Sequence, residues 1–296
     1  IVGSCLLRAI REVLGAEVAT DAVIAAWAAA YQQLADLLIG AEEDVYAAAA
    51  AAPGGWRGAR PFQVARKVIE SDEIVSLYLQ PADGGAVMAF QPGQYIGLKL
   101  TVDGQEVRRN YSLSAPSNGA TYRISVKREP GGLVSNFLHD AVGTGATIDL
   151  FPPAGDFVLQ PGNRPLVLIS GGVGITPTLP MLHAAHEQNR PVTFLHFARS
   201  GRVHAFRDWV DDLVARHAQA RQFYCYEEDG AAQADAYGRP SAELLDRWMP
   251  ARRDLDAYFV GPPPFMGAIK RMLGKLGVPA GQMHWEFFGP AAALED

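Results

Sequence analysis

Residues 166–177 read Leu-Val-Leu-Ile-Ser-Gly-Gly-Val-Gly-Ile-Thr-Pro, and they decide the fold of the second half of the chain. The apolar run at 166–170 predicts a buried β-strand, and the glycines after it predict a tight turn into a helix. We expect Thr176 to cap this helix and Pro177 to occupy its first position. Such a turn allows the backbone to approach a pyrophosphate, which the N–H groups at the start of the helix would bind. A purely structural turn is the alternative, because the spacing differs from G-x-G-x-x-G.

The same alternation of strand and helix continues from about residue 164 towards the C-terminus. Residues 192–197, 222–226 and 257–260 are compact apolar runs, whereas residues 205–214 have an amphipathic, helical spacing. This order predicts an α/β domain with a parallel sheet that is wrapped by helices.

A different pattern occupies residues 61 to about 150. Short strand-like runs at 64–69, 74–79, 95–100 and 122–126 are separated by turn sequences. Many short strands at even spacing predict a small antiparallel β-barrel.

The first 52 residues or so read as two helices. Apolar residues recur at helical spacing, Gly15 offers a stop, and Thr20 is a suitable N-cap for the second helix. A short join between two helices predicts an antiparallel pair, whose apolar surface needs a partner to pack against. We therefore predict a multi-domain chain with an all-α part at 1–57, a β-barrel at 58–162 and an α/β domain at 163–296.

Composition excludes several function classes. The chain has 26 Lys and Arg against 32 Asp and Glu, so a basic nucleic-acid-binding surface is not expected. No apolar run reaches the ~18 residues of a membrane span, and the two cysteines fit a reducing cytoplasm. His183 and His186 have helical spacing but no further ligand near them in sequence, so we predict surface histidines and no metal site.

Four further motifs carry chemistry. An Arg-Asn-Tyr-Ser motif at 109–112 lies at the end of a strand and supplies an arginine for a phosphate and a tyrosine for a planar ring, although each of these residues taken singly is more often a surface charge or a core aromatic. Residues 127–135 contain basic side chains, a Pro-Gly-Gly turn and a serine, although a charged hairpin would look the same. A strand at 258–260 stops at Gly-Pro before a helix, which taken alone is an ordinary strand-to-helix turn. Residues 284–290 form an aromatic tail with a carboxylate, which could lie over a planar ring or simply be a packed chain end.

Taken in order, these motifs resemble the ferredoxin-reductase-like FAD and NAD(P)H module over about residues 60–290. The elements R-x-Y-S, G-G-x-G-x-T-P and G-P-x-x-F-M carry the resemblance. The helical front, the sequence Pro-Gly-Gly-Trp at 53–56 and the tail Glu-Phe-Phe-Gly-Pro at 286–290 are similar to flavohemoglobins. The sequence begins with Ile rather than Met, and the resemblance implies that the front of a globin domain is missing from it.

The resemblance implies an FAD site on the barrel and a nicotinamide-nucleotide site at the glycine-rich turn. The implied FAD-side contacts are Tyr95, Arg109, Asn110, Tyr111, Ser112, Gly132, Val134, Ser135, Phe287, Phe288, Gly289 and Pro290. The implied coenzyme contacts are Gly171, Gly172, Val173, Gly174, Ile175 and Thr176. Glu42 matches a family carboxylate beside the heme, and Glu286 matches one between flavin and heme, so both are implied catalytic residues.

The implied reaction is hydride transfer from NAD(P)H to FAD and electron delivery to a globin heme, where oxygen converts nitric oxide to nitrate. Two departures bear on it. Val260 stands where the family usually has a cysteine, which leaves the rate of hydride transfer open. The intact family protein carries heme b, yet this chain has no histidine before His139 and so no axial imidazole.

Other readings remain open from the sequence. A stand-alone FAD-dependent NAD(P)H reductase that supplies an oxygenase would share the same motifs, and so would a flavin-binding sensor without turnover. Arg199 and Arg202 follow the second strand of the parallel sheet, where arginines could favour the 2′-phosphate of NADPH, but they could equally be ordinary loop charges. The choice between NADH and NADPH therefore stays open. We expect a monomer.

Overall fold

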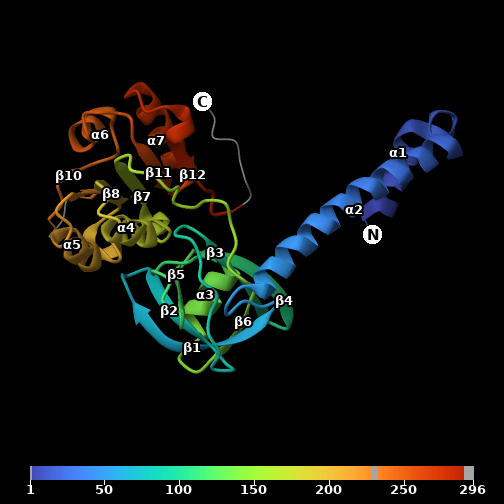
Figure 1. The fold of residues 1–296 in the computed structure, drawn as a ribbon, viewed down its shortest axis with the longest axis horizontal. Helices are drawn as coiled ribbons and strands as arrows, with labels where there is room; N and C mark the ends of the chain where they lie inside the picture. Colours follow the sequence, from blue (N-terminus) through green and yellow to red (C-terminus); the bar gives the residue numbers. More distant parts are fainter. Residues whose placement is uncertain (1, 229–232, 290–296) are drawn as a thin grey trace. The chain divides into compact units, whose positions relative to one another are not determined.

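The computed structural model describes residues 2–228 and 233–289, and the chain divides into two compact units, Ile1–Arg57 and Gly58–Asp296. The first unit consists of helices α1 (Val2–Val18) and α2 (Asp21–Ala51) (Figure 1). The predicted stop at Gly15 is a kink within α1, where the φ of 73° lies in the left-handed region that favours glycine. The predicted cap is confirmed, because the Thr20 hydroxyl accepts a hydrogen bond from the Val23 N–H.

Helix α1 folds back along α2, as the predicted antiparallel pair requires. Gly3 lies against the Tyr31 ring, so closely that a Cβ on it would be 2.6 Å from Cε1. Neither helix contains a fully buried residue, and Trp27, Leu34 and Leu37 are all more than half exposed. By length and composition α2 could cross a membrane, contrary to the sequence expectation, because its alanines keep a long window apolar. A single such helix near an N-terminus is weak evidence for a membrane span, because other helices pass the same test.

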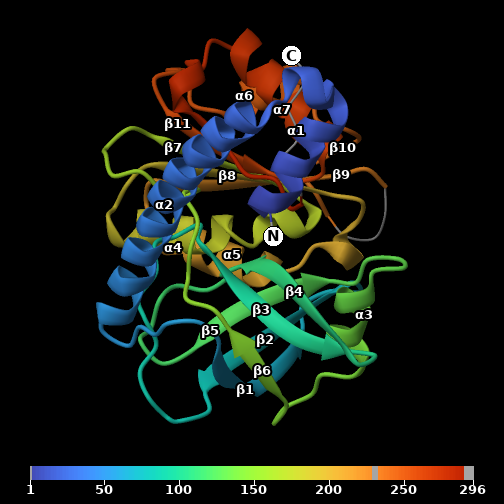
Figure 2. The same cartoon turned by 90° about the vertical axis from the view of Figure 1, so that its right-hand side faces the viewer.

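The second unit begins with a six-stranded antiparallel sheet in the order β4-β3-β6-β1-β2-β5 (Figure 2). After β4, Leu113 forms a bridge with Ile124 of β5, so the two edge strands approach each other and the sheet curls into a half-barrel. This confirms the predicted antiparallel architecture. The elements are β1 (Arg60–Ile69), β2 (Ile74–Pro81), β3 (Tyr95–Val102), β4 (Gln105–Ser112), β5 (Tyr122–Lys127), helix α3 (Leu133–Asp140) and β6 (Thr147–Leu150).

A six-stranded parallel sheet follows, in the order β10-β9-β8-β7-β11-β12, which confirms the predicted α/β part. The order reverses beside β7, and ligands bind at such switch points in open α/β sheets. The strands are β7 (Leu166–Gly171), β8 (Val192–Ala198), β9 (Ala220–Tyr226), β10 (Ala236–Tyr237), β11 (Asp256–Val260) and β12 (Met283–Trp285). The helical segments are η1 (Gly172–Ile175), α4 (Thr178–Glu187), η2 (Gly201–Val203), α5 (Arg207–Ala215), α6 (Ala242–Trp248), α7 (Pro263–Lys275) and η3 (Ala280–Gln282).

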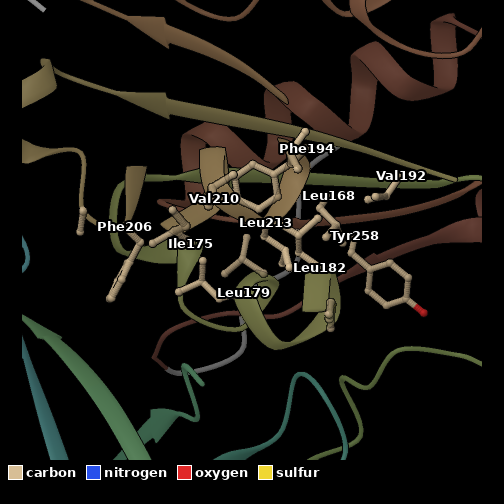
Figure 3. Close-up of a cluster of buried hydrophobic side chains, with 14 of the residues drawn as sticks. Leu168, Ile175, Leu179, Leu182, Val192, Phe194, Phe206, Val210, Leu213 and Tyr258 are labelled. Atoms are coloured by element: carbon tan, nitrogen blue, oxygen red, sulfur yellow. The ribbon is translucent and has the colours of Figure 1, made fainter. Parts of the chain in front are cut away.

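Helices α4 and α5 cover one face of this sheet, whereas α6 and α7 cover the other (Figure 1). On the first face, Leu168 and Phe194 from the strands pack with Leu179 of α4 and Val210 of α5, and all four are fully buried (Figure 3). This apolar packing fixes the strand ends from which the candidate site is built.

The glycine-rich turn differs from the prediction in one respect. The short helix η1 lies between β7 and α4, so Thr176 falls inside the turn and does not cap α4. Its hydroxyl instead donates a hydrogen bond to the Val173 carbonyl at 3.0 Å, and Pro177 occupies the N-cap position. Thr176 is displaced from the cap position because the glycines allow the chain to form the turn η1 immediately after the strand.

Candidate functional site

A cavity of about 910 Å³, here called the first cavity, is formed by the ends of β3 and β4, the start of α3 and the C-terminal tail. It brings together residues that lie up to 194 positions apart in the sequence, from the antiparallel sheet, from the turn after β7 and from the tail after β12. The predicted residues that line it are Tyr95, Arg109, Asn110, Tyr111, Ser112, Gly132, Val134, Ser135, Val173, Thr176, Glu286, Phe287, Phe288 and Gly289.

One part of the first cavity suits a phosphate. Arg109 is exposed; its Nη1 donates to the Arg108 carbonyl at 2.7 Å, and no carboxylate pairs with it among residues 2–228 and 233–289. Helix α3 begins here without a side-chain cap, so N–H groups of its first turn are available at the cavity wall. A guanidinium and an uncapped helix N-terminus together form an anion site, which fits the diphosphate of FAD.

Position 132 leaves no room for a side chain, which explains the glycine there. A Cβ at this position would lie only 2.5 Å from the Ser135 Oγ. That hydroxyl accepts a hydrogen bond from the Glu129 N–H and so connects the start of α3 to the preceding loop. The sequence motif at 127–135 is therefore a turn that leads into α3 rather than a charged hairpin.

Aromatic side chains line another part of the same cavity. Burial raises the pKa of Tyr111 to about 12, and the nearby charge of Arg109 offsets this only in part, so the phenol is neutral near pH 7 and can donate a hydrogen bond. The Tyr95 ring packs against Gly155, where φ is 111° and a Cβ would lie 2.9 Å from ring carbons. Two tyrosines in the wall of one cavity suit a planar cofactor ring. The sequence alone did not indicate that Gly155 packs against this ring.

Glu286 lies at the boundary between the first cavity and a further cavity of about 550 Å³ that also contains Asp156. Burial and, to a smaller extent, the charge of Asp156 together raise the pKa of Glu286 to about 7. A carboxyl that titrates near neutrality can hold or release a proton next to the first cavity. Sequence reasoning did not find Asp156, because 130 residues separate the two carboxylates.

A second cavity, of about 700 Å³, lies at the carboxyl ends of β7, β8 and β9. Four predicted coenzyme residues line it: Gly171, Gly172, Val173 and Gly174. A Cβ on Gly174 would lie 2.2 Å from the Val260 carbonyl oxygen, so the turn packs directly on β11. Charged side chains also line it: Arg199 and Glu227 from the parallel-sheet part, and Glu73, Lys127 and Glu129 from the FAD-side part of the unit. The site is therefore a strand-end pocket of the kind that binds nucleotides.

Several predicted residues lie elsewhere. Ile175 is fully buried in the apolar core, so its side chain reaches neither cavity, because the turn through η1 points it inwards. Pro290 lies outside the described residues. Val260 is fully buried beneath Gly174.

Glu42 belongs to the first unit, where it is exposed and accepts a hydrogen bond from the Tyr46 hydroxyl at 2.5 Å. Residues 2–57 contain no histidine, so this unit offers no imidazole to a heme, and the residues present do not make a complete heme site.

The histidine prediction needs a correction. His186 is half-buried rather than on the surface, since its ring meets that of the buried His217 at a centroid distance of 5.3 Å. Within the described ranges, no group of three or more His, Cys, Asp or Glu side chains is arranged to hold a metal ion.

Two family models match the second unit. The model described as the oxidoreductase FAD-binding domain matches residues 61–159, which contain the antiparallel sheet. The model described as the oxidoreductase NAD-binding domain matches residues 168–271, which contain most of the parallel sheet. The first cavity therefore belongs to an FAD-binding domain and the second to an NAD-binding domain.

Solved structures agree with this division. The FAD/NAD-binding domain of nitric oxide dioxygenase from Vibrio cholerae is 41% identical, with a TM-score of 0.74 over 79% of this chain and 100% of that one. A flavohemoglobin from Malassezia yamatoensis with bound FAD and heme is 27% identical, with a TM-score of 0.82 over 96% of this chain and 73% of that one.

Sequence relatives extend the likeness over the whole chain. A flavohemoprotein of Pseudomonas aeruginosa is 66% identical over 296 residues, which is all of this chain and 75% of that protein. A flavohemoprotein of Deinococcus radiodurans is 49% identical over 99% of this chain and 75% of its own length. At this identity and coverage, the chain belongs to the flavohemoprotein family.

Proposed function

We propose that this chain is the reductase part of a nitric oxide dioxygenase. It oxidises NAD(P)H through FAD, and oxygen and nitric oxide are substrates of the intact protein, whose globin heme this chain alone does not ligate. The observation that carries the proposal is that the two cavities share wall residues: Val173 and residues 287–289 line both. A nicotinamide in the second cavity and a flavin in the first would therefore lie next to each other.

When bound, FAD supplies the chemistry that accepts a hydride and releases single electrons. The residues of this chain bind and orient it. Arg109 and the first turn of α3 would hold the diphosphate, and Tyr95 and Tyr111 would position the ring system. Residues 287–289 would contact both nucleotides, because they line both cavities. Glu286, whose pKa is raised to about 7, would hold or release a proton at the edge of the same cavity.

Anaerobic stopped-flow measurement tests the proposal. The chain is reconstituted with FAD and mixed with NADH or NADPH, and we expect the flavin absorption band near roughly 450 nm to bleach. Flavin that binds but is not reduced would identify a sensor instead of an enzyme. A chain that retains no flavin would overturn the proposal.

We also propose that the protein acts as a monomer in the cytoplasm. One chain carries both cavities, so hydride transfer needs no second copy. Cys5 is exposed and Cys225 is buried, and both are free thiols, which suits a reducing compartment. Light scattering of the intact protein and fractionation of the cells that produce it would test the two statements separately.

A further inference from the structure

Arg199 occupies the position in the second cavity where the coenzyme ribose is expected. It follows directly after β8, the strand next to the glycine-rich turn, and in dinucleotide-binding sheets this position recognises the ribose 2′ substituent. Its guanidinium is already paired, since Nη2 donates to the Glu73 carboxylate at 2.5 Å. Glu73 comes from the turn between β1 and β2 of the FAD-binding domain, 126 residues away in the sequence.

The carboxylate is the more firmly placed member of this pair. The Glu73 side chain is 19% exposed, whereas that of Arg199 is 61% exposed. Backbone hydrogen bonds hold Glu73 at both sides: its carbonyl accepts from the Arg128 N–H at 2.8 Å, and its own N–H donates to the Ser71 hydroxyl. The backbone position of Glu73 is therefore held on both sides, and its carboxylate is the less exposed member of the ion pair.

A second ion pair keeps the two loops together. The Arg202 Nε donates to Asp72 Oδ2 at 2.8 Å, and the Asp72 N–H donates to the Arg202 carbonyl at 3.1 Å. Asp72 does not line the second cavity, whereas Glu73 and Glu227 do. The two neighbouring acids thus differ. Asp72 connects its loop to the loop that carries Arg202, whereas Glu73 places a negative charge in the wall of the second cavity.

We propose that Glu73 is a coenzyme-specificity residue that the FAD-binding domain contributes to the NAD-binding site. It neutralises Arg199, so that the pocket accepts a ribose 2′-hydroxyl and disfavours a 2′-phosphate. A 2′-phosphate bound to Arg199 would have to compete with Glu73 for the guanidinium, and it would lie in a cavity that Glu73 and Glu227 also line. Like charges in a binding site disfavour such a partner. The inference rests on the proposed function, because it assumes that the second cavity binds NAD(P)H.

Glu73→Gln tests this role, because it keeps the size and the hydrogen-bonding capacity of the side chain and removes its charge. We expect kcat/KM for NADPH to rise by about tenfold or more, through a lower KM, whereas kcat/KM for NADH changes by less than about threefold. Asp72→Asn is the matched control, since it weakens the neighbouring ion pair and leaves Arg199 with Glu73. Adding Arg199→Ala to Glu73→Gln should remove the gain.

Binding of adenosine 2′,5′-bisphosphate to the FAD-loaded protein gives a readout that does not depend on turnover. Calorimetry should show tighter binding to Glu73→Gln than to the parent chain, with no such difference for 5′-ADP. An unchanged NADPH-to-NADH ratio, or an equal gain in Asp72→Asn, would overturn the proposal. Failure of NADH to reduce the flavin in the parent chain would instead contradict the proposed function, and the nucleotide titration would still decide the role of Glu73.

Discussion

Arg190 and Asp256 form a buried ion pair, with 2.6 Å between Nη2 and Oδ2, although 66 residues separate them in the sequence. Their side chains are 2% and 7% exposed. Arg190 also donates to the carbonyl oxygens of Arg164 and Gln160, so it connects the segment between the two sheets to the start of β11. This pair therefore fastens the segment that precedes β7 to the parallel sheet at β11.

Asp256→Ala should lower the free energy of unfolding by about 3–5 kcal/mol, because it leaves a buried arginine charge without its partner. Urea denaturation of the FAD-loaded chain would measure the loss. Glu106→Ala is the control, since Glu106 pairs with Arg108 where both side chains are at least half exposed; it should cost at most about 1 kcal/mol. Equal losses in the two variants would show that the buried pair has no special role.

Arg109→Ala should weaken FAD binding by about tenfold or more, because a hydrogen bond from a charged group to phosphate is worth about 1.5–3 kcal/mol. Titration of the flavin-free chain with FAD, followed by quenching of flavin fluorescence, measures the affinity. Arg66→Ala is a matched control, because Arg66 is exposed and lies over the Tyr78 ring instead of in the first cavity. Unchanged FAD affinity in Arg109→Ala would remove this arginine from the site.

Glu286→Gln should change how stability depends on pH. The pKa of Glu286 is raised from 4.5 to about 7 in the folded chain, mainly by burial. Between these values the folded state keeps a proton that the unfolded state has lost, so the contribution of this group to stability falls as pH rises and is fully lost above about pH 7. Glutamine is neutral at every pH, so the Glu286→Gln variant does not lose this contribution to stability as the pH rises.

Thermal unfolding of the flavin-free chain from pH 4 to pH 8 would measure the difference. Relative to the parent, Glu286→Gln should be more stable at the upper end of this range than at the lower end. Asp156→Asn should move the transition of Glu286 to lower pH, because it removes the charge that raises the pKa of Glu286. Parallel pH profiles for parent and Glu286→Gln would contradict the assignment.

Much of the fold follows from local sequence. The apolar run at 166–170 with its glycines predicted β7 and its turn, and Thr20 predicted the start of α2, because strand burial and helix capping depend on neighbouring residues. The predicted role of Thr176 as a cap was wrong, because a helix cap and a residue at the end of a 3₁₀ turn have similar local sequences, and the sequence did not show that the glycines form the separate turn η1 before α4.

Long-range pairs in the site could not be predicted in this way. Glu73 meets Arg199, and Asp156 raises the pKa of Glu286, across the two domains of the second unit. Neither acid lies in a motif, and a solvated loop carboxylate has the same sequence signature. Only the folded chain shows that these charges face the cavities.

Gly174→Ala should disturb the coenzyme site and the sheet beneath it. The new Cβ would meet the Val260 carbonyl oxygen at 2.2 Å and the Gly261 nitrogen at 2.9 Å, and these backbone atoms cannot move away without displacing β11 or η1. We expect NADH to reduce the flavin at least about tenfold more slowly, with a lower unfolding midpoint, because close packing in this turn positions the nucleotide.

Gly267→Ala is the matched control. It lies within α7, where the nearest atom to a new Cβ is 3.5 Å away, so it should add about 0.5–1 kcal/mol of stability through helix propensity and leave flavin reduction unchanged. Normal flavin reduction in Gly174→Ala would show that the turn does not need this close approach to bind the coenzyme.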